Sequence, residues 1–335
     1  MADAPVHAML LAAGLGTRLG ELSAERPKPM FPVCNRPLVR WAANLCVEHG
    51  LREISVNLHH LGEQLRAELG DGADLGARVR YSPEPVILGT GGGIKAMAAQ
   101  HPRGTAVVMN AKLVVDIDLR ELLAFHRERG ALATLVLHED PQPERWGALG
   151  IDENGRLTRL LEQRRPGAGV TRDLMFCGIH VLEPEVVEAI PDGPCCIIRT
   201  AYSTLFRAGA PLVGYVLRGT FQEHSTPRRY LDGNLDLLRG IGVPRVCPGP
   251  LRGVDPSARV DPSARLVEPV LVGPGATVGP GATVGPEVVL GDGARVAAGV
   301  DVSRAVVWPG AEVRARATEA IITPLACLQL GGQRA

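Results

Sequence analysis

The sequence predicts an α/β domain with a mixed, mainly parallel sheet and helices on both faces, followed by a parallel β-helix of hexapeptide repeats. Up to residue 243, apolar stretches of strand length alternate with stretches of helical periodicity, which is typical of strands joined by crossover helices. From Arg252 onward a large apolar residue recurs at every sixth position, a period that no α-helix has. We therefore predict a first domain over residues 1–243, a linker over 244–250 and a β-helix over 251–325.

Length and composition limit the possible classes of protein and of partner. The chain has 335 residues, enough for two domains with separate cores. Lys plus Arg and Asp plus Glu both total 36, so we expect no nucleic acid and no membrane among its partners. Seven cysteines without a C-x-x-C pair favour reduced thiols in a cytoplasmic protein over a disulfide framework or a zinc site. The apolar N-terminal run lacks basic flanks and enters a glycine turn, so we expect a strand there, not a signal peptide.

The first expected strand, residues 6–11, leads into a turn that contains Gly14 and Gly16. Glycine lets the main chain approach a phosphate closely, because it has no Cβ in the way. Arg18 can fork two oxygens of a triphosphate, while Lys28, between two prolines, offers a compact ammonium on a stiffened segment. A Gly-x-Gly turn by itself is more often turn chemistry than a ligand site.

The other elements of the first domain follow from the same periodicities and from capping residues. Strands are predicted at residues 53–58, 78–81, 105–109, 131–137, 157–161, 175–182 and 212–217. Helices are predicted at residues 37–47, 60–69, 119–129, 184–190, 198–208 and 227–239. Asp118 and Thr226 are the expected N-caps of two of these helices. Residues 152–155 carry an Asn-Gly hairpin turn.

A second glycine cluster, ILGTGGGIKAMA at residues 87–98, opens another helix. Such a turn can lie flat against a nucleobase, because it carries almost no side chains. The alternative is a helix N-terminus with flexible glycines and no ligand.

The six-residue period runs through Val254, Val260, Leu266, Val272, Val278, Val284, Leu290, Val296, Val302 and Trp308. A second small or apolar residue follows each of these by four positions in most units. Each hexapeptide lays down one short strand on a triangular prism, so these units give about three coils and a continuous interior.

Residues 11–38 resemble the signature of the sugar-1-phosphate nucleotidyltransferases, LAAGxGTRLxPLTxxxPKPMxPVxNxPL. The matches are Leu11, Ala12, Ala13, Gly14, Gly16, Thr17, Arg18, Leu19, Leu22, Pro27, Lys28, Pro29, Met30, Pro32, Val33, Asn35, Pro37 and Leu38, whereas Glu21 replaces a proline. The hexapeptide region resembles the left-handed β-helix at the C-terminus of many such enzymes, most like the mannose-1-phosphate guanylyltransferase type. The resemblance implies a Rossmann-like first domain followed by a left-handed β-helix.

The resemblance also implies a reaction. A sugar-1-phosphate oxygen attacks the α-phosphorus of a nucleoside triphosphate and pyrophosphate leaves, with Mg²⁺ stabilising the phosphate charge. Nucleotide-binding residues are then expected at Leu11, Ala13, Gly14, Gly16, Thr17, Glu84, Gly89, Thr90 and Asn110. Sugar-binding residues are expected at Gly147, Glu162 and Gly178. Arg18, Lys28, Lys112 and Glu223 fall at the catalytic positions, and Glu223 is the one carboxylate left as a metal ligand there.

Three positions depart from the family pattern. The metal-binding Asp of the NGD motif is Lys112, which would repel Mg²⁺ although it can contact phosphate oxygens. The Asp of the WxDxGTP motif is Glu223, and the Lys of the Glu-Lys-Pro motif is Gln163. Two hypotheses follow: an enzyme with a rearranged metal site, or an inactive nucleotide-sugar sensor or regulatory subunit that acts on a protein partner. The sequence does not select the base or the sugar.

The β-helix is expected to serve assembly. β-Helices of hexapeptides also occur in acyltransferases, where a histidine of a coil activates the acceptor. Here the last histidine is His224, ahead of the first coil, so that base is missing. We expect a homo-oligomer or a protein partner bound through the β-helix, or a lid role for it, because an open prism end exposes strand edges.

Overall fold

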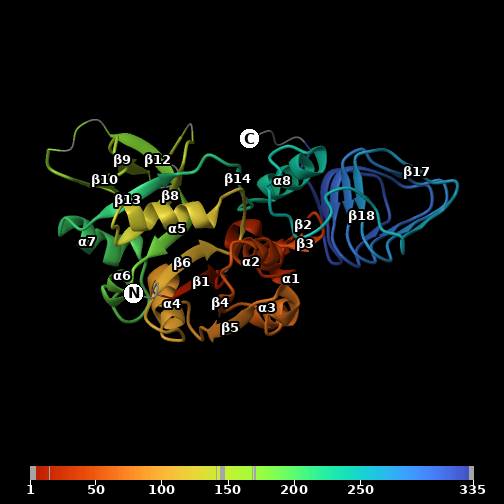
Figure 1. The fold of residues 1–335 in the computed structure, drawn as a ribbon. Coiled ribbons are helices and arrows are strands. Elements are labelled where there is room, and N and C mark those ends of the chain that lie inside the picture. The colour runs from red at the N-terminus through yellow and green to blue at the C-terminus, as the bar shows by residue number, and fades with distance from the viewer. Residues whose placement is uncertain are drawn as a thin grey trace. The chain divides into compact units, whose positions relative to one another are not determined.

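The computed structural model describes residues 5–14, 16–140, 142–143, 148–167, 169 and 171–331. The chain forms two compact units (Figure 1). Unit 1 comprises Met1–Gly14, Ala42–Ala111 and Val115–Phe221, and unit 2 comprises Leu15–Trp41, Lys112–Val114 and Gln222–Ala335. The units therefore do not divide at the expected linker, since residues well ahead of it belong with the C-terminal region.

Unit 1 contains a mixed sheet, as predicted. Its parallel part has the order β6-β1-β4-β5, formed by β1 (Val6–Leu11), β4 (Glu53–Leu58), β5 (Arg78–Pro83) and β6 (Thr105–Asn110). The long strand β12 (Arg172–Leu182) pairs antiparallel with β6 and continues the sheet. β12 also pairs with β8 (Ala133–His138) and β9 (Leu149–Ile151). β13 (Leu212–Val216) pairs with β8, while β10 (Leu157–Leu160) and β11 (Gln163–Arg164) continue the sheet beyond β9.

The α-helices between these strands are α2 (Leu38–Glu48), α3 (Gly62–Leu69), α4 (Gly89–Ala98), α5 (Leu119–Glu128), α6 (Pro184–Glu188) and α7 (Ser203–Arg207). Asp118 caps α5, because its Oδ1 accepts hydrogen bonds from the N–H groups of Arg120 and Glu121. The helix predicted over 198–208 begins as a π-helix, η5 (Ile198–Tyr202), and continues as α7. A short 3₁₀ turn, η3, spans Ala73–Leu75.

The C-terminal part of unit 2 is a stack of parallel strands. Gly253 pairs with Leu271, Arg259 with Thr277 and Arg265 with Thr283, so each partner lies 18 residues ahead, as between Ser257 and Gly275. Eighteen residues are three hexapeptides, which agrees with a parallel β-helix that advances one coil per three repeats. The recurring apolar residues from Val272 to Val302 form one buried core inside the stack. Val254 is 42% exposed, and Trp308 packs instead against Phe31. Its left-handedness stays a prediction.

The strands of this stack are β15 (Gly253–Val254), β16 (Arg259–Val260), β17 (Arg265–Leu266), β18 (Val270–Val272), β19 (Thr277–Val278), β20 (Thr283–Val284), β21 (Val288–Leu290), β22 (Arg295–Val296), β23 (Asp301–Val307), β24 (Glu312–Val313) and β25 (Ala317–Ile322). The final strand β26 (Cys327–Gln329) turns back antiparallel along β25.

The rest of unit 2 surrounds the long helix α8 (Pro227–Arg239), which begins and ends where the sequence predicted. Its companions are η1 (Thr17–Leu19), α1 (Leu22–Glu25), η2 (Lys28–Met30), β2 (Pro32–Val33) and β3 (Arg36–Pro37). Two short strands, β7 (Leu113–Val115) and β14 (Phe221–Glu223), form a separate two-stranded sheet. We call residues 16–41 the Lys28 segment.

The Lys28 segment and the β-helix share one hydrophobic core. The ring of Phe31 packs edge-on against Tyr230 of α8 and Trp308 of the β-helix, with centroid distances of 5.5 and 5.0 Å. The side-chain amide of Asn35 donates to the carbonyl oxygen of Leu290 at 2.8 Å, and the hydroxyl of Thr323 donates to Glu25. The sequence indicated no such association between these distant segments.

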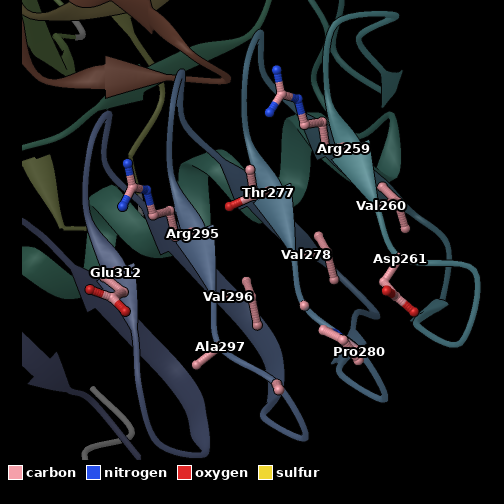
Figure 2. Close-up of a pocket in the computed structure, with 12 residues that line it drawn as sticks. Arg259, Val260, Asp261, Thr277, Val278, Pro280, Arg295, Val296, Ala297 and Glu312 are labelled. Atoms are coloured by element: carbon pink, nitrogen blue, oxygen red, sulfur yellow. The ribbon is translucent and has the colours of Figure 1, made fainter.

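One outer face of the β-helix carries a shallow depression of about 420 Å³ (Figure 2). Neighbouring strands place Arg259, Thr277, Arg295 and Glu312 in one ladder across it. None of the predicted site residues lines this depression. Within the described part of the chain, no helix is long and apolar enough to cross a membrane.

Candidate functional site

The predicted site residues are divided between the two units. Unit 2 holds Gly16, Thr17, Arg18, Lys28, Lys112 and Glu223. Unit 1 holds Leu11, Ala13, Gly14, Glu84, Gly89, Thr90, Asn110, Glu162 and Gly178. Gly147, the remaining sugar-binding prediction, lies outside the described residues.

A cluster of charged side chains gathers around Glu223 in unit 2. Oε1 of Glu223 lies 3.5 Å from Nζ of Lys28 and 3.4 Å from Nζ of Lys112. Its Oε2 lies 3.6 Å from the guanidinium of Arg229, at the start of α8. The side chains of Lys28 and Glu223 are only 9% and 11% exposed. The structure therefore brings together three of the four residues predicted at catalytic positions, and it adds Arg229, which the sequence analysis missed.

The charges in this cluster shift each other's protonation. Burial acts to raise the pKa of the Glu223 carboxyl, but Lys28, the hydroxyl of Ser225 and Lys112 outweigh it and hold that pKa below its usual range. Burial, followed by the like charge of Lys112, lowers the pKa of Lys28 to about 7, although Glu223 opposes the change. Glu223 is thus an anion at neutral pH. For Lys28, the lowering of the pKa by burial and by its positive neighbours is larger than the increase that Glu223 causes.

Local geometry fixes the Lys28 segment beside this cluster. Gly16 has a φ of +65°, and a Cβ there would lie 2.8 Å from Oγ of Ser23. That hydroxyl donates to the carbonyl oxygen of Gly16 at 2.8 Å, so both the turn and the close approach require glycine. Thr17 and Arg18 follow in η1 and are exposed. The positive charge of Arg18 acts on both Lys28 and Glu223, which places the fourth catalytic prediction near the same cluster.

The cluster does not fit a magnesium ion. Mg²⁺ takes six oxygen ligands, usually one or two carboxylates with substrate phosphates and waters. Here Glu223 supplies one carboxylate, and its two oxygens face the cations of Lys28, Lys112 and Arg229. Across the part of the chain that the structure describes, no group of three or more His, Cys, Asp or Glu side chains could hold a metal ion. These contacts do not support the predicted role of Glu223 as a metal ligand.

In unit 1, Asn57 connects the two glycine turns. Its Oδ1 accepts hydrogen bonds from the N–H groups of Ala12 at 2.6 Å and Ala13 at 3.2 Å. Its Nδ2 donates to Oε1 of Glu84 at 2.7 Å, while Oε2 of Glu84 accepts from the N–H of Leu88 at 2.8 Å. Sequence reasoning missed Asn57, although an amide inside the apolar run of β4 was a possible signal.

These contacts describe the surroundings of two predicted residues. Glu84 is only 3% exposed, and its two oxygens accept hydrogen bonds from Asn57 of β4 and from the N–H of Leu88 ahead of α4; its role in nucleotide binding stays a prediction. The N–H of Ala13 donates to Asn57, and the N–H of the exposed Gly14 donates to the carbonyl oxygen of Ala12 at 2.9 Å.

The second glycine turn is packed against the chain itself. Gly91, Gly92 and Gly93 are buried at the start of α4. A Cβ on Gly91 would lie 2.5 Å from Sγ of Cys195, and one on Gly93 would lie 2.8 Å from Nδ2 of Asn57. Internal packing therefore explains these three glycines. Gly89, with φ +69°, and Thr90 remain exposed at the helix start, where N–H groups can meet an anion.

Three predicted residues meet where the parallel strands end. Leu11 pairs with Asn110 across β1 and β6, and Met109 pairs with Ile179 across β6 and β12. Gly178 has a φ of +72°, and a Cβ there would collide with the side-chain amide of Asn110. The carboxyl ends of parallel strands are where open α/β sheets bind ligands; the binding roles of Leu11, Asn110 and Gly178 stay predictions.

A separate pocket of about 270 Å³ contains Glu162 and Gln163. Arg199, from the π-helix η5, and Ser203 also line it, and the amide of Gln163 donates to the hydroxyl of Ser203. Sequence reasoning missed Arg199, a single charge in a mostly apolar helical stretch. Its guanidinium supplies a positive charge to the pocket in which Gln163 replaces the family lysine.

Comparison with known proteins identifies the family. Residues 7–196, more than half of the chain, match the family model described as Nucleotidyl transferase. The chain belongs to the nucleotidyl transferase family. Its curated relatives confirm the predicted membership among the sugar-1-phosphate nucleotidyltransferases. Enzymes of this family generally use Mg²⁺.

Two relatives show the extent of the similarity. Mannose-1-phosphate guanylyltransferase of Mycobacterium tuberculosis is 33% identical over 243 residues, which cover 72% of this chain and 67% of that protein. UTP--glucose-1-phosphate uridylyltransferase of Synechocystis is 33% identical over 201 residues, covering 56% of this chain. The matched region spans about half of the Synechocystis protein, at 52% of its length.

Solved structures agree on the fold. HddC of Yersinia pseudotuberculosis, crystallised with GMP-PN, superposes with a TM-score of 0.58 at 20% identity, over 69% of this chain and 99% of that one. A candidate glucose-1-phosphate thymidylyltransferase of Bacillus anthracis, in complex with sucrose, gives a TM-score of 0.59 at 17% identity, over 69% of this chain and 94% of the other. At these identities the likeness concerns the fold alone.

Proposed function

We propose that this chain binds a nucleoside triphosphate or nucleotide-sugar, together with a sugar-1-phosphate, but lacks the metal-assisted turnover of its relatives. It then acts as a nucleotide-sugar sensor or regulatory subunit for a protein partner. The observation that carries the proposal is the ion pair between Lys112 and Glu223, 3.4 Å apart, at the two positions where the family motifs have metal-binding aspartates.

The physical argument concerns the transition state. During nucleotidyl transfer negative charge builds on the phosphate oxygens, and a divalent cation supplies much of its stabilisation. Glu223 is the carboxylate of the described cluster, and both of its oxygens face positive side chains, so a divalent cation is held poorly there. Loss of this stabilisation costs several kcal/mol, or about three powers of ten in rate. Substrate binding survives in this proposal because the glycine turns are present and Arg199 supplies a positive charge to the pocket of Glu162.

The second candidate is a working nucleotidyltransferase with a rearranged site. The observation that favours it is that Lys28 and Glu223 lie 3.5 Å apart, beside an arginine at position 18 whose charge acts on both. In this case the cluster itself stabilises the transition state, and Glu223 orients Lys28.

Pyrophosphate release separates the two candidates. The purified chain is assayed with Mg²⁺, first with GTP and mannose-1-phosphate and then with UTP and glucose-1-phosphate, the substrates suggested by the names of its relatives. Binding of the same nucleotides is measured in parallel by calorimetry. We expect binding with release at least a thousandfold below a typical enzyme of about 10 s⁻¹. Release that collapses in Glu223→Ala supports the working enzyme, and absence of nucleotide binding contradicts both candidates.

The β-helix provides the proposed surface for a partner or a second copy. The ladder of Arg259, Thr277, Arg295 and Glu312 presents charges of both signs and one hydroxyl, which a complementary surface can match (Figure 2). Light scattering on the intact chain tests assembly into a homo-oligomer. If the measured mass remains that of a monomer at high protein concentration, the proposed partner is a different protein.

A further inference from the structure

We propose that Lys28 and Lys112, with Arg229, form a site that binds the oligophosphate of a nucleotide directly and without a divalent cation, with Glu223 as its internal counter-ion. This inference rests on the proposed function and specifies the chemistry of the same site. The chemical class of the ligand is a di- or triphosphate ester.

The first support is the charge balance of the cluster. Lys28 and Lys112 share one oxygen of a single carboxylate, Glu223, and Arg18 adds a further positive charge that acts on Lys28 and Glu223. An excess of like charge in a partly buried place is costly unless an anion compensates it. An oligophosphate carries several negative charges, so it offsets this excess where a monovalent anion does not.

The second support is the distance of each contact. The ammonium groups of Lys28 and Lys112 lie 3.5 and 3.4 Å from the same oxygen of Glu223, whereas a good charge-assisted hydrogen bond is about 2.7–2.9 Å long. Glu223 is therefore close enough to hold the two ammonium groups in place, but it does not saturate their donors. Each lysine carries three donors, and these can turn to phosphate oxygens.

The third support is the position of Lys112. Lys112–Val114 is a short segment that belongs to unit 2 with Glu223, and the side chain of Lys112 is 29% exposed. It thus combines a fixed place in the cluster with access for a ligand. A fixed ammonium there supplies positive charge to phosphate oxygens and repels a divalent cation.

The alternative is that these ion pairs only stabilise the fold. In that case Lys112→Ala changes the unfolding temperature and leaves oligophosphate binding unaffected. The test therefore measures binding and stability on the same variants.

The experiment is calorimetric titration of the intact chain with GTP and with inorganic tripolyphosphate, in EDTA and in Mg²⁺. We expect binding in EDTA that is within about threefold of that in Mg²⁺, and Lys112→Ala to weaken it by about tenfold. Lys112→Arg keeps the charge and should restore most of the affinity. Lys112→Asp should make binding dependent on Mg²⁺. Arg314→Ala is the matched control, since Arg314 is 79% exposed and pairs with Glu312 on the β-helix.

The outcomes are distinguishable. Nucleotide binding that occurs in Mg²⁺ but not in EDTA overturns the metal-free site and leaves the proposed function intact. Equal affinity of Lys112→Ala and the unaltered chain in EDTA also overturns it. No nucleotide binding under either condition overturns the proposed function itself.

Discussion

The indole N–H of Trp308 donates a hydrogen bond of 3.0 Å to the hydroxyl of Tyr230, which in turn donates to the carbonyl oxygen of Pro32 at 2.5 Å. Trp308 belongs to the β-helix, Tyr230 to α8 and Pro32 to the Lys28 segment. All three groups are buried. This relay makes the β-helix part of the scaffold that holds Lys28.

Replacement of Trp308 should destabilise unit 2. Trp308→Ala removes a fully buried ring and leaves the hydroxyl of Tyr230 without its donor, so we expect a loss of about 3–5 kcal/mol in the free energy of unfolding. Trp308→Phe keeps most of the volume and should cost less. Urea unfolding monitored by circular dichroism measures both, with Arg314→Ala as the exposed control. A loss below about 1 kcal/mol for Trp308→Ala would contradict this role.

His180 should make stability depend on pH. It is fully buried in β12, its Nδ1 lies 2.5 Å from the hydroxyl of Tyr202, and burial lowers its pKa to about 3. Since the folded pKa lies below the usual 6.5, the unfolded chain binds the proton first. The contribution of neutral His180 to the free energy of unfolding is present above pH 6.5. It is lost as pH falls toward 3, by about 1.4 kcal/mol between pH 7.5 and 5.5.

The difference between the unaltered chain and His180→Gln isolates this contribution from those of other groups. Urea unfolding at pH 7.5, 6.5 and 5.5 gives the free energy of unfolding of each protein. We expect the gap between them to narrow as pH falls. A gap that is the same at all three values would show that His180 is not kept neutral by burial.

Gly178→Ala tests the end of the parallel strands. A side chain at a φ of +72° is strained, and its Cβ would also displace the amide of Asn110. Gly209→Ala is a matched control, because Gly209 has a φ of +78° with open space around it. We expect about 1 kcal/mol of destabilisation for Gly209→Ala. Gly178→Ala should destabilise the protein at least twice as much and should also weaken GTP binding. If Gly178→Ala and Gly209→Ala affect GTP binding equally, Asn110 has no role in it.

Asn57→Ala tests the connection between the glycine turns. It removes the acceptor of two backbone N–H groups and the donor to Glu84, so buried polar groups lose their partners at about 1–3 kcal/mol each. We expect a lower unfolding temperature and weaker nucleotide binding by calorimetry. Asn154→Ala, in an exposed turn, is the control. Unchanged binding in Asn57→Ala would mean that the two turns act independently.

Elements with local signals were predictable from the sequence. Helix α8 was predicted with the correct bounds, helped by the capping residue Thr226 and by Pro227 in its first turn. In the structure Gly240 follows the last residue with a positive φ, which ends the helix. The hexapeptide period predicted the parallel strands, because one residue of each unit must enter the core. The signature likewise predicted the family, since its residues lie within one short stretch.

Features that depend on distant contacts were not predictable in this way. The hydrogen bond from Asn35 to Leu290 joins residues 255 positions apart, and no local pattern encodes it. Asn57 and Arg229 acquire their roles only when other segments pack beside them. The ion pairs between Glu223 and its positive neighbours also became visible only in the structure. The sequence showed Lys112 and Glu223 as two separate departures from the family motifs.

The shared core of the Lys28 segment and the β-helix has a consequence for protein synthesis. Residues 16–41 leave the ribosome long before Leu290, Trp308 and Thr323, which pack against them. The Lys28 segment therefore cannot complete its core until the β-helix has been synthesised. A premature stop codon ahead of Leu290 should remove the support of the Lys28 segment together with the β-helix strands.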